Sequence, residues 1–248
     1  MKTAEIKVDY VDHMGDDLAV VNAARVSFDK ESAWEYEDVK AIGHENAYNE
    51  VRRLSDADAK LIKYLAEHNH WSPFAHAIVK LRVKAPIFVA RQLVKHQVGA
   101  SWNEVSRRYV NSEPEFYFPD VWRGRPTNGA KQGSSGVVDL YPTKPKAARY
   151  NDPYMLCWLA LQAYNGLLGD GVAPEQARMV LPQNMMTEWI WTGSLVFWAR
   201  VCRERLAPGA QKEAGDVARL IGEAVQPLFP VSWAALSGKD YLPEAVAV

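Results

Sequence analysis

The chain has 248 residues, 48% of them hydrophobic, and 29 Lys and Arg residues stand against 30 Asp and Glu. These values are typical of a soluble globular protein and argue against intrinsic disorder, collagen and coiled coil. A net charge of −1 argues against nucleic-acid binding through bulk charge. The acidic N-terminal segment predicts no signal peptide, and the lack of a long uncharged apolar run predicts no membrane-spanning helix.

The chain contains only two cysteines, Cys157 and Cys202. Two cysteines cannot form a disulfide framework, which indicates a reducing compartment. We therefore expect a cytoplasmic protein, or one of the host cytoplasm if its source is viral. Neither cysteine lies in a nucleophile motif, and Cys157 falls within an apolar helix, so we expect buried thiols.

The N-terminal part predicts a strand, a helix, an insertion and a second helix. Residues 4–12 are typical of a strand, and residues 16–27 have helical periodicity. The polar stretch 30–54 is expected to be an inserted loop or a short helix. Ser55 with Asp58 three residues later is a capping-box-like helix start.

The next segment predicts a strand followed by a helix. Val79, Leu81 and Val83 alternate with charged residues, which is typical of a half-buried strand. Pro86 then begins a predicted helix that continues to Gln97. A loop with strand character is expected over 98–109, and a further strand over 115–119.

The second half of the chain looks mainly helical. The glycine-rich stretch 123–136 predicts a surface loop or a flexible lid. The helices that we expect after it span 152–169, 174–180, 195–206 and 210–227. The predicted fold is α+β, a single domain over 1–248 with an antiparallel sheet in the first half, a helical C-terminal half, and flexible insertions at 30–54 and 120–143.

Polar residues are densest between Arg91 and Tyr109. On a continuous helix, Gln92 and His96 would share a face. Arginine, serine and backbone N–H groups together are suited to a phosphate, and an amide such as that of Gln92 or Asn103 can read a base edge. The alternative is a solvated helix end with a salt-bridged loop.

A second basic cluster comprises Arg200, Arg203 and Arg205. Arg200 and Arg203 would share a helix face, and Arg205 would point elsewhere. The alternative here is a charged helix surface with Glu204 as ion-pair partner. Arg178 lies in a separate amphipathic segment, where a lone arginine is usually a surface or ion-paired residue.

Three histidines, at positions 68, 70 and 76, have no acidic or cysteine ligand at a diagnostic spacing. We therefore predict no metal site. The sequence also lacks a G-x-G-x-x-G motif after a strand and a Walker A motif, so it does not support a Rossmann or P-loop nucleotide site.

Five stretches in this order resemble the flavin-dependent thymidylate synthases: MGDDLAVVNAARVSFD, HNHWSPFAH, VKAPIFVARQLVKHQ, NEVSRRY and ARMVLPQN. The resemblance covers most of the chain outside 30–54 and 120–150. It implies an α+β fold, a homotetramer with active sites between subunits, and conversion of dUMP to dTMP. It also implies methylenetetrahydrofolate as carbon donor and FAD, reduced by NADPH, as hydride source.

The resemblance assigns roles to individual residues. It places FAD near His70, Ser72, Lys95, His96, Gln97, Glu104, Ser194 and Arg200. It places dUMP near Gln92, Lys95, Glu104, Val105, Ser106, Arg107, Arg108 and Arg178, with N–H groups of Val105 and Arg107 assisting. Arg205 matches the catalytic arginine at the N3–O4 edge of the uracil. No nucleic-acid or membrane partner is implied.

The chain departs from the family pattern at two places. The family signature Arg-His-Arg, seven residues, then Ser stands here as Lys95-His96-Gln97, eight residues, then Ser106. After Trp191-Thr192 the family often has Asn-x-Arg and a later Asn, where this chain has Ser194, Val196 and Arg200. These changes are typical of a divergent branch of the family, for which a viral source is one interpretation.

The residue inventory favours chemistry without a cysteine nucleophile. A cation such as Arg205 beside the uracil stabilises negative charge as C5 becomes nucleophilic, and Ser106 then orients the substrate. Two alternatives stay open. One is a related flavin enzyme that modifies another pyrimidine nucleotide, and the other is a catalytically inactive nucleotide-binding homologue.

Overall fold

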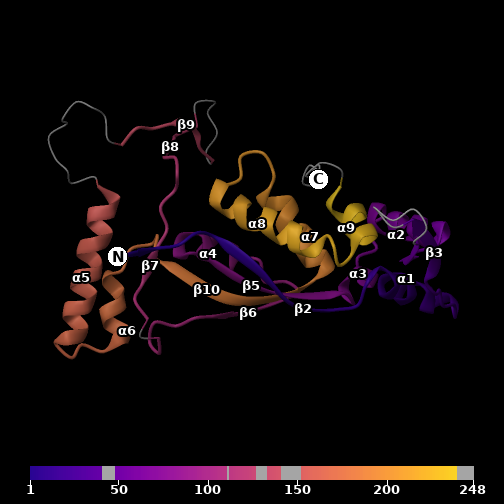
Figure 1. Cartoon of the computed structure of the whole chain (residues 1–248), viewed down its shortest axis with the longest axis horizontal. Coiled ribbons are helices and arrows are strands. Elements are labelled where there is room, and N and C mark those ends of the chain that lie inside the picture. The colour runs from indigo at the N-terminus through magenta and orange to yellow at the C-terminus, as the bar shows by residue number, and fades with distance from the viewer. Residues whose placement is uncertain (41–47, 111, 127–132, 141–151, 239–248) are drawn as a thin grey trace.

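The computed structural model of the chain describes residues 1–40, 48–110, 112–126, 133–140 and 152–238. Figure 1 shows an elongated molecule with a sheet along its long axis. Helices of the C-terminal region lie over one side of this sheet, α5 and α6 lie at one end of the molecule, and α1 to α3 lie at the other.

Four antiparallel strands form the central sheet, in the order β2-β5-β10-β6. Their bounds are Lys7–Met14 for β2, Ile78–Pro86 for β5, Ala100–Glu104 for β6 and Met186–Ser194 for β10. Strands β5 and β10 pair without interruption from Ile78 opposite Ser194 to Pro86 opposite Met186. The α+β class is thus confirmed.

The predicted alternation in β5 is confirmed. Val79, Leu81 and Val83 are fully buried in the core that the sheet shares with the C-terminal helices. The charged side chains between them lie on the opposite face, where Arg82 pairs with Glu188 of β10. One face of the sheet therefore packs against helices and the other is lined by ion pairs.

Strand β10 lies between β5 and β6, although we expected the second half of the chain to be mostly helical. Trp189 and Trp191 are buried, while Ile190 and Thr192 between them are only partly covered. This period of two is the signal for a half-buried strand. We predicted no element between 180 and 195, because this short run lies between two helical patterns.

Five helices are described in the second half. They are α5 (Pro153–Gly169), α6 (Pro174–Ala177), α7 (Leu195–Arg205), α8 (Lys212–Val225) and α9 (Pro230–Ser237), with a 3-10 turn at Arg178–Val180. The sequence predicts the first four but not α9, because the last predicted helix ends at 227 and a proline at position 230 usually stops a helix. Pro230 instead occupies the first turn, where its missing N–H costs nothing.

The first half contributes α1 (Asp17–Arg25), a 3-10 turn (Val26–Phe28), α2 (Asp56–Glu67), α3 (Ser72–Ala75) and α4 (Ile87–Leu93). Strands β1 (Lys2–Thr3) and β7 (Glu115–Phe116) form a short parallel pair. Helix α4 ends at Leu93, so Lys95 and His96 lie in the turn after it and the predicted continuous helix to Gln97 is wrong.

The predicted insertions contain two antiparallel hairpins. In 30–54, which we expected to be a loop or a short helix, β3 (Glu35–Lys40) pairs with β4 (Tyr48–Arg53). In 120–143, β8 (Arg123–Gly124) pairs with β9 (Ser135–Val137). Residues 41–47, 127–132 and 141–143 of these insertions lie outside the described residues.

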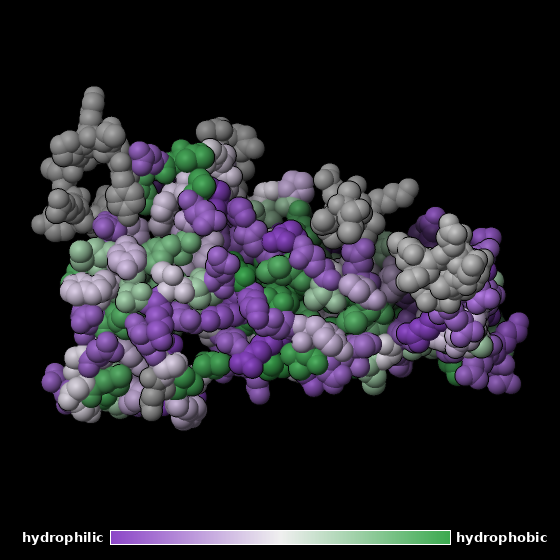
Figure 2. All heavy atoms as spheres, in the orientation of Figure 1, coloured by the Kyte–Doolittle hydropathy of each residue, from purple (hydrophilic) through white to green (hydrophobic). Residues whose placement is uncertain are grey.

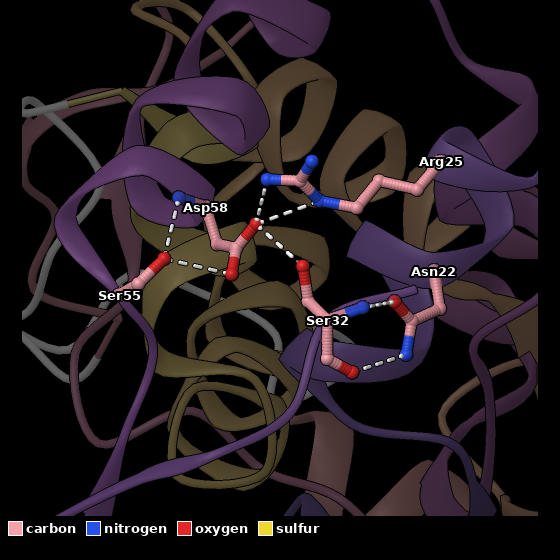
Figure 3. Close-up of polar contacts among 5 residues, drawn as sticks. All are labelled: Asn22, Arg25, Ser32, Ser55 and Asp58. Atoms are coloured by element: carbon pink, nitrogen blue, oxygen red, sulfur yellow. Dashed lines mark hydrogen bonds and ion pairs between the residues drawn. The ribbon is translucent and has the colours of Figure 1, made fainter. Parts of the chain in front are cut away.

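A buried carboxylate joins α1, α2 and the segment before β3 (Figure 3). Asp58 is 2% exposed, and its Oδ1 accepts from Arg25 Nε at 2.9 Å and from Ser32 Oγ at 3.0 Å. Ser55 caps α2, accepting from Asp58 N and donating to Asp58 Oδ2, so the predicted helix start at Ser55 is confirmed. Asn22 bonds both backbone groups of Ser32. Burial raises the pKa of Asp58, but these donors outweigh it and the net pKa lies below its ordinary value.

Candidate functional site

The first candidate surface is a cavity of about 550 Å³ beside α6. We call it the α6 cavity. Glu104, Val105, Arg107 and Arg178 line it, so four of the residues assigned to dUMP meet there although they come from separate segments. Arg178 follows α6 directly, and the other three lie at the end of β6.

Glu104 is held at the wall of this cavity by two donors. Thr187 Oγ1 donates to Glu104 Oε1 at 2.7 Å, and Trp102 Nε1 donates to Oε2 at 3.3 Å. Thr187 is buried and comes from β10. Sequence reasoning missed Thr187 because it missed β10, and the alternation of that strand would have revealed it.

Two guanidinium groups face the α6 cavity. Arg107 donates through Nη1 to Ser112 O, and Arg178 donates through Nε to Glu175 O at 3.3 Å. Burial lowers the pKa of Arg107, but arginine stays charged at neutral pH. Each arginine uses one nitrogen for the backbone, which leaves further N–H donors for an anion.

Other residues assigned to dUMP do not line this cavity. Ser106 Oγ accepts from Arg108 Nε at 3.1 Å, a local contact within the loop. Val105 does line the cavity, but its N–H donates to Glu188 O at 2.8 Å, so this N–H is occupied rather than free for the nucleotide. Gln92 Oε1 is buried without a hydrogen-bond partner among the described residues.

A second cavity, of about 350 Å³, lies where β6 and α7 begin. We call it the α7 cavity. Ser194 and Arg200, both assigned to FAD, line it together with Trp71 and Ser101. Ser194 also caps α7, since its Oγ accepts from Phe197 N at 3.3 Å.

Two glycines shape the wall of the α7 cavity. Gly99 has φ of +82°, a left-handed conformation that turns the chain into β6. A Cβ on Gly193 would lie 2.2 Å from Phe197 Cδ1, so only glycine lets β10 approach the first turn of α7 this closely. Both positions therefore require glycine.

A third cavity, of about 630 Å³, lies between α1, α2 and α3. We call it the α1 cavity. His70 and Ser72, which the resemblance assigns to FAD, line it beside Tyr64 and Arg25. Because Asp58 binds both Nε and Nη2 of Arg25, this guanidinium is fixed where it meets the cavity.

Arg205 contacts His96 rather than Glu204, the ion-pair partner that the alternative interpretation of this cluster gives. Arg205 Nε lies 2.9 Å from His96 Nε2, and Glu204 Oε2 lies 3.8 Å from His96 Nδ1. The pKa of His96 lies below its ordinary value because of burial first and the positive charge of Arg205 second, while Glu204 opposes them. The neighbouring Lys95 and Gln97 are exposed.

Both thiols are buried and protonated at neutral pH. Burial raises the pKa of Cys202 to about 12 and also raises the pKa of Cys157. Cys202 Sγ contacts Ala218 O at 3.2 Å, and Cys157 Sγ contacts Asn184 Oδ1 at 3.3 Å. Neither thiol has the low pKa of a nucleophile.

The assigned residues are spread along the molecule. Arg178 follows α6 at one end, whereas Ser72 begins α3 at the other end (Figure 1). Within the described residues, no group of three or more His, Cys, Asp or Glu side chains is arranged to hold a metal. Across the same part of the chain, no helix is both long and apolar enough to cross a bilayer.

Comparison with known proteins identifies the family. The family model described as thymidylate synthase complementing protein, Thy1, matches residues 9–231. A flavin-dependent thymidylate synthase of Thermus thermophilus is 39% identical over 228 residues, which cover 92% of this chain and 74% of that protein. The enzyme of that name from Kosmotoga olearia is 36% identical, with 93% and 90% covered.

A solved structure is also similar. It is the UMP/dUMP methylase PolB from Streptomyces cacaoi bound with 5-Br dUMP, with a TM-score of 0.70, 28% identity, and 96% of this chain and 97% of that chain covered. The sequence match and the fold therefore agree. The chain belongs to the Thy1 family, which includes the flavin-dependent thymidylate synthases, and it is an enzyme of that family.

Proposed function

We propose that this enzyme methylates dUMP to dTMP, with methylenetetrahydrofolate as carbon donor and FAD reduced by NADPH as hydride source. The observation that carries the proposal is the α6 cavity. Two arginines and a fixed glutamate line it, and in a member of this family such a set of groups supports a site for a nucleotide monophosphate.

The α6 cavity has the chemistry of a nucleotide site. Arg107 and Arg178 retain N–H donors for a phosphate, which arginine binds with two parallel hydrogen bonds. The buried Oε1 of Gln92 lacks a partner among the described side chains, and an N–H of the ligand or a water would satisfy it. The two arginines would hold the phosphate, whereas Gln92, which lies outside the lining of this cavity, is assigned to the base by the resemblance alone.

Residues around the α7 cavity fit FAD. Arg200, Ser101 and Ser194 offer a cation and two hydroxyls to a pyrophosphate, and Trp71 offers an aromatic face to a flat ring. When bound and reduced, the flavin supplies the hydride. Lys95 keeps one positive charge of the family triplet but lacks the paired N–H donors of a guanidinium. FAD would therefore be held more weakly than in relatives with two arginines.

The longer spacing between His96 and Ser106 leaves the strand intact. Strand β6 pairs with β10 in unbroken register from Ala100 to Glu104. The left-handed Gly99 lies just before it. The Asn103–Tyr109 segment matches the family pattern if the extra residue falls before Ser101, and the uninterrupted strand from Ala100 supports that position.

The chain's own groups bind and polarise the substrate. Arg205 would place its charge beside the N3–O4 edge of the uracil, which favours the anionic form as C5 becomes nucleophilic. Ser106 would orient the nucleotide. No thiolate is required, in agreement with the protonated state of Cys157 and Cys202.

The decisive experiment is a turnover assay. Purified protein with FAD is reduced by NADPH without oxygen, and dUMP with methylenetetrahydrofolate is added. We expect dTMP to form, and omission of FAD, NADPH or the folate to abolish it. Reduction of bound flavin without dTMP formation would contradict the proposal.

Flavin binding is measured separately by tryptophan fluorescence. Trp71 is 58% exposed and lines the α7 cavity, so FAD should quench its emission in a saturable manner. The Trp71→Phe variant should lose part of this signal. A flat titration of the wild type would favour an inactive homologue that binds nucleotide without flavin.

One observation favours a second substrate. The structural neighbour PolB is described as a methylase of both UMP and dUMP. The turnover assay therefore includes UMP and dCMP at matched concentrations. Faster methylation of UMP than of dUMP would assign the enzyme to a different pyrimidine nucleotide.

A further inference from the structure

One contact joins the end of α7 to the turn after α4. Arg205 Nε donates to His96 Nε2 at 2.9 Å, although the two residues are 109 positions apart. The side chain of His96 is only 7% exposed. The contact uses the inner nitrogen of the guanidinium, so both terminal nitrogens of Arg205 remain available for other acceptors.

The geometry also determines the tautomer of His96. An imidazole nitrogen that accepts from arginine carries no proton, so the proton of neutral His96 lies on Nδ1. Nδ1 faces Glu204 Oε2 at 3.8 Å. The ring therefore lies between a carboxylate and a guanidinium that are neighbours on α7.

We propose that His96 is a positioning residue, which in its neutral form holds Arg205 by Nε and presents the terminal nitrogens of Arg205 to the nucleotide. The proposal deepens the proposed function and rests on it. An unrestrained arginine loses rotational freedom about several side-chain bonds when it binds a ligand. An acceptor that fixes the side chain beforehand reduces this entropic cost. Contact with flavin, which the resemblance assigns to His96, does not explain why its Nε2 is directed at Arg205.

The contact is sensitive to pH. Protonation of His96 removes the acceptor at Nε2 and places a positive charge beside Arg205. Burial is the main cause of the low pKa of His96, Arg205 and Arg200 add to it, and Glu204 opposes them; within the described part of the chain, these three groups supply the charges that act on the ring. Because the folded pKa is lowered, the contact is intact at neutral pH and is lost as the pH falls through that lowered value.

The first test needs no turnover. The imidazole of His96 is observed by ¹H–¹⁵N NMR in wild type and in Arg205→Ala, with the signal assigned by its absence in His96→Gln. We expect the Nδ1–H tautomer in wild type and a pKa that rises in Arg205→Ala, since a neighbouring positive charge has been removed. An unchanged pKa and tautomer would overturn the contact. This result stands even if dUMP is not the substrate.

The second test separates positioning from flavin binding. His96→Gln retains an acceptor close to the position of Nε2, whereas His96→Phe keeps a ring without one. We expect His96→Phe to lower kcat about tenfold or more while the Kd for FAD stays similar, and His96→Gln to recover most of the loss. His96→Gln should also lose the acid limb of the pH profile.

The control is His68→Phe. His68 is exposed at the end of α2 and should tolerate this change. Equal kcat values for His96→Phe and His96→Gln, or a loss that appears only in the Kd for FAD, would overturn the positioning role. Absence of dTMP formation by the wild type would instead refute the proposed function.

Discussion

Arg205 and Cys202 lie one turn apart on α7 but have opposite surroundings. Cys202 faces the core, where burial raises the pKa of its thiol to about 12. Arg205 is partly covered and reaches across to His96. The depth at which each side chain is buried, rather than residue type alone, thus decides which group is available for chemistry.

We predict that Arg205→Ala stays folded, still binds FAD, and loses dTMP formation by about a hundredfold or more, as expected for loss of an electrostatic donor to a developing charge. The activity of Arg205→Lys should lie between those of Arg205→Ala and wild type, since lysine restores the charge without the paired N–H donors of a guanidinium. Steady-state kinetics with dUMP measure the effect. Arg203→Ala, an exposed arginine on the same helix, is the control. A fully active Arg205→Ala would show that the catalytic cation lies elsewhere.

We also predict that both cysteines are dispensable. Cys157→Ala and Cys202→Ser should keep most of the specific activity, because both thiols are protonated at neutral pH and no step calls on a thiolate. Circular dichroism checks that each variant is folded. A folded Cys202→Ser variant without turnover would restore a covalent mechanism.

At the scale of elements, the Asp58 cluster joins two helices to the first hairpin (Figure 3). Arg25 comes from α1, Ser55 begins α2, and Ser32 precedes β3. Arg25 also lines the α1 cavity. The carboxylate therefore fixes the shape of a surface assigned to the cofactor as well as the packing of the helices.

This cluster predicts that the stability of the fold decreases at acidic pH. The pKa of Asp58 in the folded state lies below its ordinary value. Ionised Asp58 therefore contributes fully to the free energy of unfolding above about pH 4, and this contribution is lost as the pH falls through the folded pKa. Urea midpoints measured from pH 7 to pH 3 should fall at the acid end. Asp58→Asn should be less stable at neutral pH, with a difference from wild type that shrinks in acid.

The control for this measurement is Asp56→Asn. Asp56 lies on the same helical turn, but its side chain is 86% exposed and its contact with Arg53 is 3.4 Å long. It should change stability by about 0–1 kcal/mol. A constant difference between wild type and Asp58→Asn at every pH would contradict the assigned pKa.

At the scale of the whole molecule, the candidate residues are too widely separated for one compact site. The α6 cavity lies toward one end of the molecule and the α1 cavity at the other (Figure 1). Helix α5 also exposes apolar side chains: Met155, Leu156, Trp158 and Leu159 are 43% to 54% exposed. Polar and apolar residues mix over the face shown in Figure 2. The separation of the candidate residues and the exposed apolar side chains of α5 support the expected homotetramer with sites shared between subunits.

Complementation tests the shared site. We predict that Arg178→Ala and Arg205→Ala are each nearly inactive alone, because each removes one cation from every site. In mixed oligomers made by co-expression, about a quarter of the sites should carry neither substitution if the two arginines come from different subunits. Activity of the mixed sample is measured against each variant. No recovery in a mixed oligomer would place both arginines on one subunit.

The local sequence pattern was sufficient to predict secondary structure where a segment's own residues determine it. The alternation of β5, the cap at Ser55 and the starts of α5 and α7 could all be predicted, because propensity and capping act over a few residues. The family, and with it the class of chemistry expected of the residues around Glu104, also followed from ordered sequence blocks.

Other features depend on contacts between distant segments, and only the tertiary structure decided them. Strand β10 becomes central because β5 and β6 pair with its two edges, and α9 begins at Pro230 because Asp17 accepts from its first N–H groups. The Arg205 partner is His96 rather than the adjacent Glu204, since the turn after α4 brings the imidazole to the end of α7. Pairings across such sequence distances have no local signal, because their free energy arises only when the segments have packed together.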